Sequence, residues 1–265
     1  WMHRMIDAHH DAATRSGARV VFAGGFDSVP SDIGMLLLQE TAIERHGAPM
    51  PRVRMRVRSL RGSGSGGSMA SGRAIMEAAR EDPSVFSSLV DPFSLAPGFQ
   101  GPDQPRAQER IEEPDFGGWS GPFMMAMINT KVVHRSNFLL DHRYGADLVY
   151  DEMILLGPDP VEGSGDMGMD PDLQPGEGPT REEREAGHYD IVLRGEDEAG
   201  NIVETRVAAD LDPGYGSTSQ IIGEAALTLL ERSGPGGCTT PAVTLGLAFI
   251  DRLREHAGVR IDVVD

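Results

Sequence analysis

Several residue types are scarce in this 265-residue sequence, and each scarcity argues against a class of protein. The chain contains one cysteine, Cys238, so no disulfide can form within it, which is typical of a reducing compartment. It contains one lysine, Lys131, against 23 arginines, and its 41 acidic residues give a net charge of −17. A nucleic-acid footprint needs clustered basic residues, so this charge argues against a nucleic-acid partner.

Long apolar runs are also missing. No stretch of about 18 uncharged apolar residues is present, so the sequence predicts no transmembrane span. The first residues lack the basic and then apolar stretches of a secretory signal. Hydrophobic residues still make up 39% of the chain, enough for a buried core. These observations together predict a soluble, cytoplasmic protein.

The acidic residues are concentrated in one region. Residues 151–186 hold 11 acids and two bases, whereas residues 1–150 hold 17 acids and 16 bases. Within that region, residues 157–181 are poor in bulky apolar side chains and rich in glycine and proline, a composition typical of loops. We therefore predict a mobile acidic loop over 157–181.

The periodicity of apolar residues predicts two kinds of architecture. Residues 1–47 have the pattern of an α/β unit, with helices over 2–16 and 31–47 around a buried strand over 18–26. Later residues predict strands over 51–60 (half-exposed), 144–157 and 259–264, and a hairpin over 187–211. They also predict helices over 68–80, 218–234 and 240–254. The segment 123–140 is ambiguous between strand and helix, and the segment 82–122 shows little periodicity. The predicted fold class is an α+β domain with a mixed, mainly antiparallel sheet, preceded by the last helix and strand of an α/β domain.

A glycine-rich turn follows the strand predicted over 51–60. Gly62, Gly64 and Gly67 match the G-x-G-x-x-G pattern of dinucleotide-binding turns. However, the preceding strand alternates arginine with apolar residues, and no second buried strand ends in an acid about 20 residues later. The turn is better suited to binding a substrate carboxylate through free N–H groups at the start of a helix, with Ser65 and Ser68 assisting. Gly66, Gly67 and Ser68 are therefore candidate substrate-binding residues.

The histidines near the start of the chain do not form a metal-ligand pattern. His9 and His10 are adjacent and so point to different faces of a helix, and His3 with Asp7 would need a third ligand. We expect no metal site. The sequence has no G-x-S-x-G motif, and Cys238 has no local sign of activation, so we interpret it as a packed residue.

The segment GGFDSVPSDIG (24–34) leads from the apolar run into the second helix. Asp27, Ser28 and Ser31 can each cap that helix with a side-chain oxygen, and Pro30 suits its first turn. One cap would suffice, and the extra polar groups stand at the carboxyl end of a buried strand, where ligands bind in open α/β sheets. We therefore predict a helix cap that is also the floor of a ligand site.

The same segment resembles the signature of saccharopine dehydrogenase-like oxidoreductases, a family that includes bacterial trans-acting enoyl reductases. The resemblance extends from residue 1 to about 254, although Gly25 stands where many relatives carry cysteine. Three further stretches resemble the family in order: PGEGPTREEREAGHY (175–189), DPGYGSTSQIIGEAAL (212–227) and GGCTTPAVTLG (236–246).

The resemblance implies an NAD(P)-dependent oxidoreductase that transfers hydride to or from a C=C, C=N or C=O bond, such as the enoyl group of an acyl chain. Residues 1–30 would end a Rossmann NAD(P)-binding domain, and 31–265 would form the substrate-binding and dimerisation domain of a homodimer. The family's glycine-rich cofactor turn would precede Trp1, so this chain alone is expected to be inactive.

In such a fold the end of the strand faces the nicotinamide, and hydride transfer creates charge that must be stabilised or protonated. Tyr215, flanked by Gly214 and Gly216 at a helix entrance, could donate a proton, contact substrate or simply pack. The candidates are catalytic Asp27, Ser28 and Tyr215, cofactor-binding Gly24, Gly25 and Phe26, and substrate-binding Ser31, Asp32, Gly66, Gly67 and Ser68.

Two other interpretations stay open. The chain could be a non-catalytic dimerisation or interaction module with the same fold. It could also be half of a homoserine- or glyceraldehyde-phosphate-type dehydrogenase, although the run Phe-Asp-Ser-Val-Pro-Ser-Asp argues against this. The sequence preceding Trp1 would separate enzyme from module, because a strand, glycine-rich turn and helix about 100 residues earlier would support the enzyme.

Overall fold

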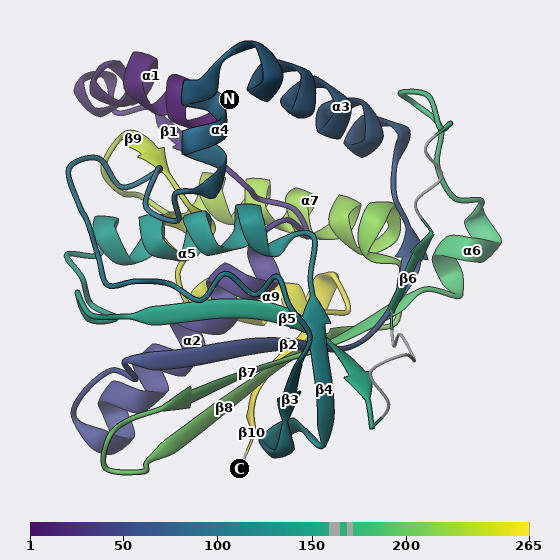
Figure 1. Cartoon of the computed structure of the whole chain (residues 1–265). Helices are drawn as coiled ribbons and strands as arrows, with labels where there is room; N and C mark the ends of the chain where they lie inside the picture. The colour runs from purple at the N-terminus through teal and green to yellow at the C-terminus, as the bar shows by residue number, and fades with distance from the viewer. Residues whose placement is uncertain (159–164, 169–171, 265) are drawn as a thin grey trace.

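A mixed sheet with helices packed on one face dominates the structure (Figure 1). The computed structural model describes residues 1–158, 165–168 and 172–264. The strand order is β10-β8-β7-β2-β5-β4-β3, and β6 pairs with the far end of β2. The β2–β5 and β2–β6 pairs are parallel and the others antiparallel, so the predicted mixed, mainly antiparallel sheet is confirmed.

The strands of this sheet are β2 (Arg52–Ser63), β3 (Ile111–Glu113), β4 (Gly118–Pro122), β5 (Val149–Gly157), β6 (Gly165–Gly168), β7 (His188–Glu196), β8 (Ile202–Ala209) and β10 (Arg260–Val264). The helices are α1 (Met2–Ser16), α2 (Val29–His46), α3 (Gly66–Glu81), α4 (Pro83–Val90), α5 (Ala126–Leu139), α6 (Arg181–Glu185), α7 (Thr218–Glu231), α8 (Pro241–Thr244) and α9 (Ala248–His256), with short turns η1 (Pro114–Phe116) and η2 (Pro213–Ser217).

Alternation along β2 separates the two faces of the sheet. Val53, Met55 and Val57 are buried on the face that α2 covers, as the period of two requires. The intervening arginines lie on the other face, so the predicted strand is confirmed. One of them, Arg56, is fully buried instead of half-exposed, because Glu113 binds it from β3.

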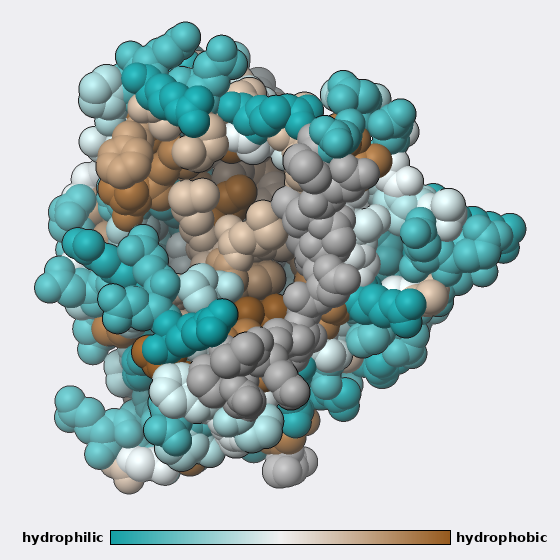
Figure 2. All heavy atoms as spheres, turned by 45° about the vertical axis from the view of Figure 1, so that its right-hand side comes forward, coloured by the Kyte–Doolittle hydropathy of each residue, from teal (hydrophilic) through white to brown (hydrophobic). Residues whose placement is uncertain are grey.

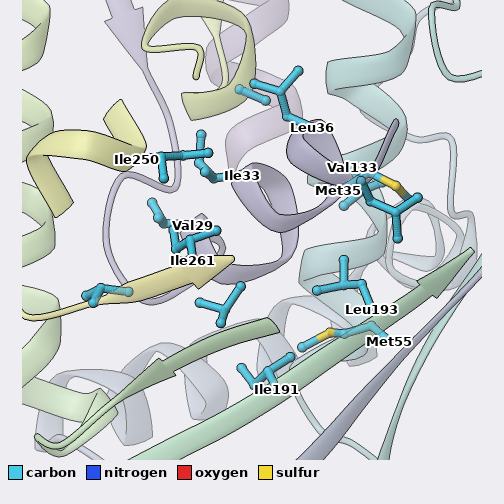
Figure 3. Packing of buried hydrophobic residues seen from close by; sticks show 14 of the residues in the cluster. Val29, Ile33, Met35, Leu36, Met55, Val133, Ile191, Leu193, Ile250 and Ile261 are labelled. Atoms are coloured by element: carbon cyan, nitrogen blue, oxygen red, sulfur yellow. The ribbon is translucent and has the colours of Figure 1, made fainter. Parts of the chain in front are cut away.

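The main core lies between α2 and the sheet. Figure 3 shows Val29 and Ile33 of α2 on one side of this core and Ile191 and Leu193 of β7 on the other. Each such buried aliphatic side chain stabilises the fold by about 1.5–3 kcal/mol. A separate small cluster around Cys238 joins α1 to β9 (Gly237–Thr239).

The strand predicted over 18–26 is much shorter in the structure. β1 (Arg19–Val21) pairs in parallel with β9 over three residues. The chain then turns at Ala23, whose φ is 56°, and two glycines follow. An irregular connection, rather than a strand, therefore leads into α2.

Other differences have local causes. The helix predicted over 240–254 is interrupted at Gly246, whose φ of 63° ends α8 before α9 begins. The ambiguous 123–140 is helical as α5, and 82–122 contains α4, β3 and β4. The predicted loop over 157–181 contains β6, while its residues 159–164 and 169–171 lie outside the described residues. In the described part, no helix has the length and apolarity needed to cross a membrane.

Candidate functional site

The connection between β1 and α2 is held against the first turn of α7. The Phe26 N–H donates to Thr218 Oγ1 at 3.0 Å, and the Phe26 ring packs on Tyr189 with centroids 4.8 Å apart. A Cβ on Gly25 would lie 3.2 Å from Thr218 Cγ2, so glycine permits this close approach. These contacts fix the backbone from which Asp27 projects.

Asp27 combines an exposed side chain with a shifted pKa. Surrounding protein desolvates the carboxyl group and raises its pKa from 3.8 to about 6. A carboxyl group with this pKa is suited to donate a proton near neutral pH.

The predicted helix cap is wrong. Ser28 is the N-cap residue of α2, but its side chain makes no capping hydrogen bond. Its backbone (φ −129°, ψ 28°) differs from the extended geometry usual at a cap. Among the described residues the buried Ser28 Oγ has no partner. The polar groups of this segment are therefore not accounted for by capping.

Asp32 is fully buried and is hydrogen-bonded by neighbouring protein groups. It accepts hydrogen bonds from Ser136 Oγ and, at 2.7 Å, from the Ala242 N–H, and Thr240 also bonds to it. Burial raises its pKa to about 7 despite these bonds. Asp32 thus binds the first turn of α8, whose N-cap residue Thr240 makes no side-chain capping bond. Its predicted substrate contact would require these bonds to open.

A buried polar cluster next to this segment was not predicted. Glu152 of β5 has no exposed surface; it accepts a hydrogen bond from Tyr150 Oη at 2.7 Å and from Asn129 Nδ2 at 2.9 Å. Ser31 of α2 also hydrogen-bonds to Glu152. One feature of the sequence could have indicated this cluster. Glu152 occupies an inward-facing position of its strand, and a buried polar residue is an exception to the usual burial of apolar side chains, so it points to a special role.

The glycine-rich turn joins other predicted residues. The Gly66 N–H donates to the Glu177 carbonyl at 3.0 Å, and Tyr215 Oη donates to the same oxygen at 3.2 Å. The structure therefore brings Gly66 and Tyr215 together. Gly67 and Ser68 are exposed at the start of α3.

These glycines are required for close packing. A Cβ on Gly62 would lie 2.6 Å from Pro213 Cδ, and one on Gly66 would lie 1.7 Å from the Gln174 carbonyl oxygen. The Ser68 N–H is already bound by Ser65 Oγ. Packing therefore accounts for one glycine of the motif, Gly62, and for the neighbouring Gly66 without a pyrophosphate.

The early histidines lie apart from this region. His10 Nδ1 accepts a hydrogen bond from the Cys238 N–H at 3.1 Å, and His3 pairs with Asp7 at 2.9 Å. Over the described ranges, no group of three or more potential ligands is arranged to hold a metal. Cys238 is fully buried, as expected of a packed residue.

Two concave surfaces stand out in the described part of the structure. Figure 2 shows a hollow with largely apolar walls below the helix at the top of the molecule, α3 in Figure 1. On the opposite face of the sheet, an open pocket of about 780 Å³ is lined by Arg52, Arg54 and Arg56. Each of these three arginines is already paired with a carboxylate.

Comparisons with known proteins place the chain among named relatives. It is 35% identical, over 98% of its length and 71% of the relative, to a Mycobacterium tuberculosis protein provisionally named a trans-acting enoyl reductase. It is 31% identical to the trans-acting enoyl reductases of M. ulcerans (94% of this chain, 68% of the relative) and M. leprae (97% and 70%). No family model matches the chain, and no solved structure matches it.

Proposed function

The chain belongs to the trans-acting enoyl reductase family, and we propose that it forms the substrate-binding part of an NAD(P)-dependent oxidoreductase that reduces the C=C bond of an acyl chain. The observation that carries this proposal is the place of Asp27, between the Phe26 backbone held by Thr218 and the start of α2, with its carboxyl pKa raised to about 6. The apolar hollow below α3 suits an acyl chain (Figure 2). The wider saccharopine dehydrogenase-like relationship, which includes C=N and C=O chemistry, rests on the signature 24–34.

The small parallel sheet supports a Rossmann-type origin for residues 1–30. Among the described strands, β1 pairs only with β9, and Val20 of β1 is 37% exposed. Parallel sheets are normally larger and covered on both faces. The open edge of β1 therefore suits further parallel strands of a nucleotide-binding sheet.

The residues that follow β1 suit the nicotinamide part of the cofactor. Gly24, Gly25 and Phe26 follow β1 at its carboxyl end, where a nicotinamide ring would lie in such a sheet. Bound NAD(P)H would supply the hydride. The turn around Gly62 and Gly66 is filled by packing, so we propose that residues outside this sequence hold the pyrophosphate and that this chain alone does not turn over.

Asp27 would supply the proton that reduction needs. Hydride addition at the β-carbon of an enoyl thioester leaves negative charge on the α-carbon and the carbonyl oxygen. The O–H bond of protonated Asp27 then breaks as a C–H bond forms at the α-carbon, and solvent returns a proton to the carboxylate. Because the pKa of Asp27 is about 6, the acid form decreases as pH rises through 6 and this step slows.

The test is oxidation of NADH and NADPH by the full-length gene product with enoyl thioesters of increasing chain length. We expect Asp27→Asn to lower kcat by about 10²–10⁴-fold, the usual contribution of general acid catalysis. Asp103→Asn, at another exposed aspartate, should leave kcat unchanged. Full activity of the Asp27 variant would overturn its role, and no oxidation with any enoyl thioester would overturn the reaction.

A further inference from the structure

The side chain of Thr218, in the first turn of α7, joins two other segments of the chain. Its hydroxyl accepts a hydrogen bond from the Phe26 N–H of the β1–α2 connection at 3.0 Å and donates to the Pro213 carbonyl of η2 at 2.8 Å. A hydroxyl has one proton and two lone pairs, so the bond to Pro213 directs the proton and leaves a lone pair for Phe26. The methyl group packs on Gly25, where a Cβ would lie 3.2 Å from Thr218 Cγ2. Both branches of Thr218 therefore contact backbone of other segments.

The turn η2, to which the Thr218 hydroxyl donates, is itself held by buried groups. Asp212 is fully buried, and its carboxyl oxygens accept hydrogen bonds from two N–H groups of the turn at 2.9 and 2.7 Å. The turn also packs against the end of β2, where a Cβ on Gly62 would lie 2.6 Å from Pro213 Cδ. The main sheet therefore fixes the turn that orients the Thr218 hydroxyl.

A second contact joins the β1–α2 connection to the start of α7. The Phe26 ring packs on Tyr189 of β7, and Tyr189 Oη is hydrogen-bonded with Ser217 Oγ at 2.9 Å. Ser217 directly precedes Thr218, so the ring and the backbone of Phe26 are held by neighbouring residues. Asp27 follows Phe26 in the chain, and its position therefore depends on this anchor.

We propose that Thr218 is a positioning residue for Asp27: its hydroxyl holds the Phe26 peptide and so sets where the Asp27 carboxyl group lies relative to the substrate. The hydroxyl proton and one lone pair are already used by protein groups, so Thr218 acts through the backbone. A general acid must lie within hydrogen-bond reach of the atom that it protonates, so a displacement of Asp27 lowers the rate. This role rests on the proposed function, whereas the anchor is a property of the folded chain.

Two substitutions separate the hydroxyl of Thr218 from the shape of its side chain. Thr218→Val keeps the branched shape but removes the acceptor of the Phe26 N–H, whereas Thr218→Ser keeps the hydroxyl. Hydrogen exchange of the Phe26 amide is followed by NMR on this chain, without cofactor or substrate. We expect Thr218→Val to speed this exchange by about 3–10-fold, the scale of one lost neutral hydrogen bond, and Thr218→Ser to retain most of the protection.

The carboxyl group of Asp27 gives a second measurement on the same samples. Its pKa of about 6 results from desolvation, so release of the connection should move the pKa toward the ordinary value of 3.8 in Thr218→Val and much less in Thr218→Ser. The titration is followed by the ¹³C chemical shift of the labelled carboxyl carbon. A Thr218→Val protein with an unchanged Asp27 titration would overturn the positioning role.

The matched control is Thr228→Val, the same substitution on the same helix. Thr228 Oγ1 donates to the Glu224 carbonyl within α7 at 2.7 Å, so its loss should leave Phe26 exchange and the Asp27 titration unchanged. Equal effects of the two valine variants would overturn the proposal, because they would reflect a general loss of stability. An unprotected Phe26 amide in the wild type would also overturn it, even if Thr218→Val did not fold.

The effect on catalysis is measured with the full-length gene product and an enoyl thioester. Thr218→Val should lower kcat by about 10–100-fold and change KM by less than about twofold, and Thr218→Ser should recover most of the rate. An unchanged kcat in Thr218→Val would overturn the positioning role. Faster Phe26 exchange in Thr218→Val of a protein that reduces no enoyl thioester would support the anchor and contradict only the proposed function.

Discussion

Buried carboxyl groups on the two faces of the central sheet have pKa values that are shifted in opposite directions. On one face, burial alone would raise the pKa of Glu113, but hydrogen bonds from Arg56 and Ser120 outweigh it and lower the pKa. On the other face, Glu152 has only neutral donors, and burial raises its pKa to about 7. The comparison teaches that the counter-charge, rather than burial, decides which carboxyl group is ionised.

The difference separates structural from chemical use of charge. Arg56 binds Glu113 through two N–H groups at 2.5 and 2.8 Å and pairs with Asp151 at 2.9 Å, which joins β2, β3 and β5. Asp27 and Glu152, by contrast, have pKa values raised to about 6 and 7. Groups that change protonation near neutral pH are suited to proton transfer, and those held ionised are suited to fixing strands.

The largest expected effect comes from removing the buried cation Arg56, on the face of the sheet that carries the β2 arginines. Arg56→Met should lower the free energy of unfolding by about 3–5 kcal/mol, because Glu113 and Asp151 would stay buried without it. Urea denaturation followed by circular dichroism measures this loss. Arg206→Met removes the exposed pair with Asp190 and should cost less than about 1 kcal/mol. Similar losses from both variants would contradict a special role for the buried cation.

Glu152 should make the free energy of unfolding fall as pH rises. Its folded pKa of about 7 exceeds its ordinary value of 4.5, so between these values the folded state binds more protons than the unfolded state. The stabilisation present below about pH 4.5 is therefore lost by about pH 7, by at most roughly 3 kcal/mol. Glu152→Gln should reduce this slope to the part that Asp27 and Asp32 contribute, because their pKa values are also raised, and should be the more stable protein above pH 7. Equal slopes for the two proteins in urea denaturation across this range would contradict the assignment.

The stabilisation by Glu113 should depend on pH in the opposite direction, and its contribution to the free energy of unfolding should be smaller. Glu113→Gln keeps the pairing of Arg56 with Asp151 and should cost about 1.5–3 kcal/mol at neutral pH, the usual contribution of hydrogen bonds to charged groups. The folded pKa of Glu113 is lowered, so its stabilisation is present above the unfolded value and is lost as pH falls through the folded value. The difference between variant and wild type should therefore shrink in acid. A difference that grows in acid would contradict the comparison of the two faces.

Periodicity predicted the elements that are stabilised by their own side-chain pattern. Alternation of arginine with apolar residues in 51–60 predicted a strand with two unlike faces, and the structure has it as β2. The hairpin over 187–211 is confirmed as β7 and β8. The helix of 240–254 could not be predicted as two pieces, because the backbone of Gly246 depends on where α9 packs. Homodimerisation and the roles of the site residues stay predictions.

For the candidate site, the sequence by itself determined that polar groups gather at GGFDSVPSDIG (24–34) and that more are present than one helix cap needs. Only the tertiary structure decided what they do. It bound Asp32 to the start of α8, more than 200 positions away, left Ser28 Oγ without a partner among the described residues, and set Glu152 against the start of α2. The physical reason is that ionisation depends on solvent and on neighbouring charge, and both are fixed only when distant segments pack together.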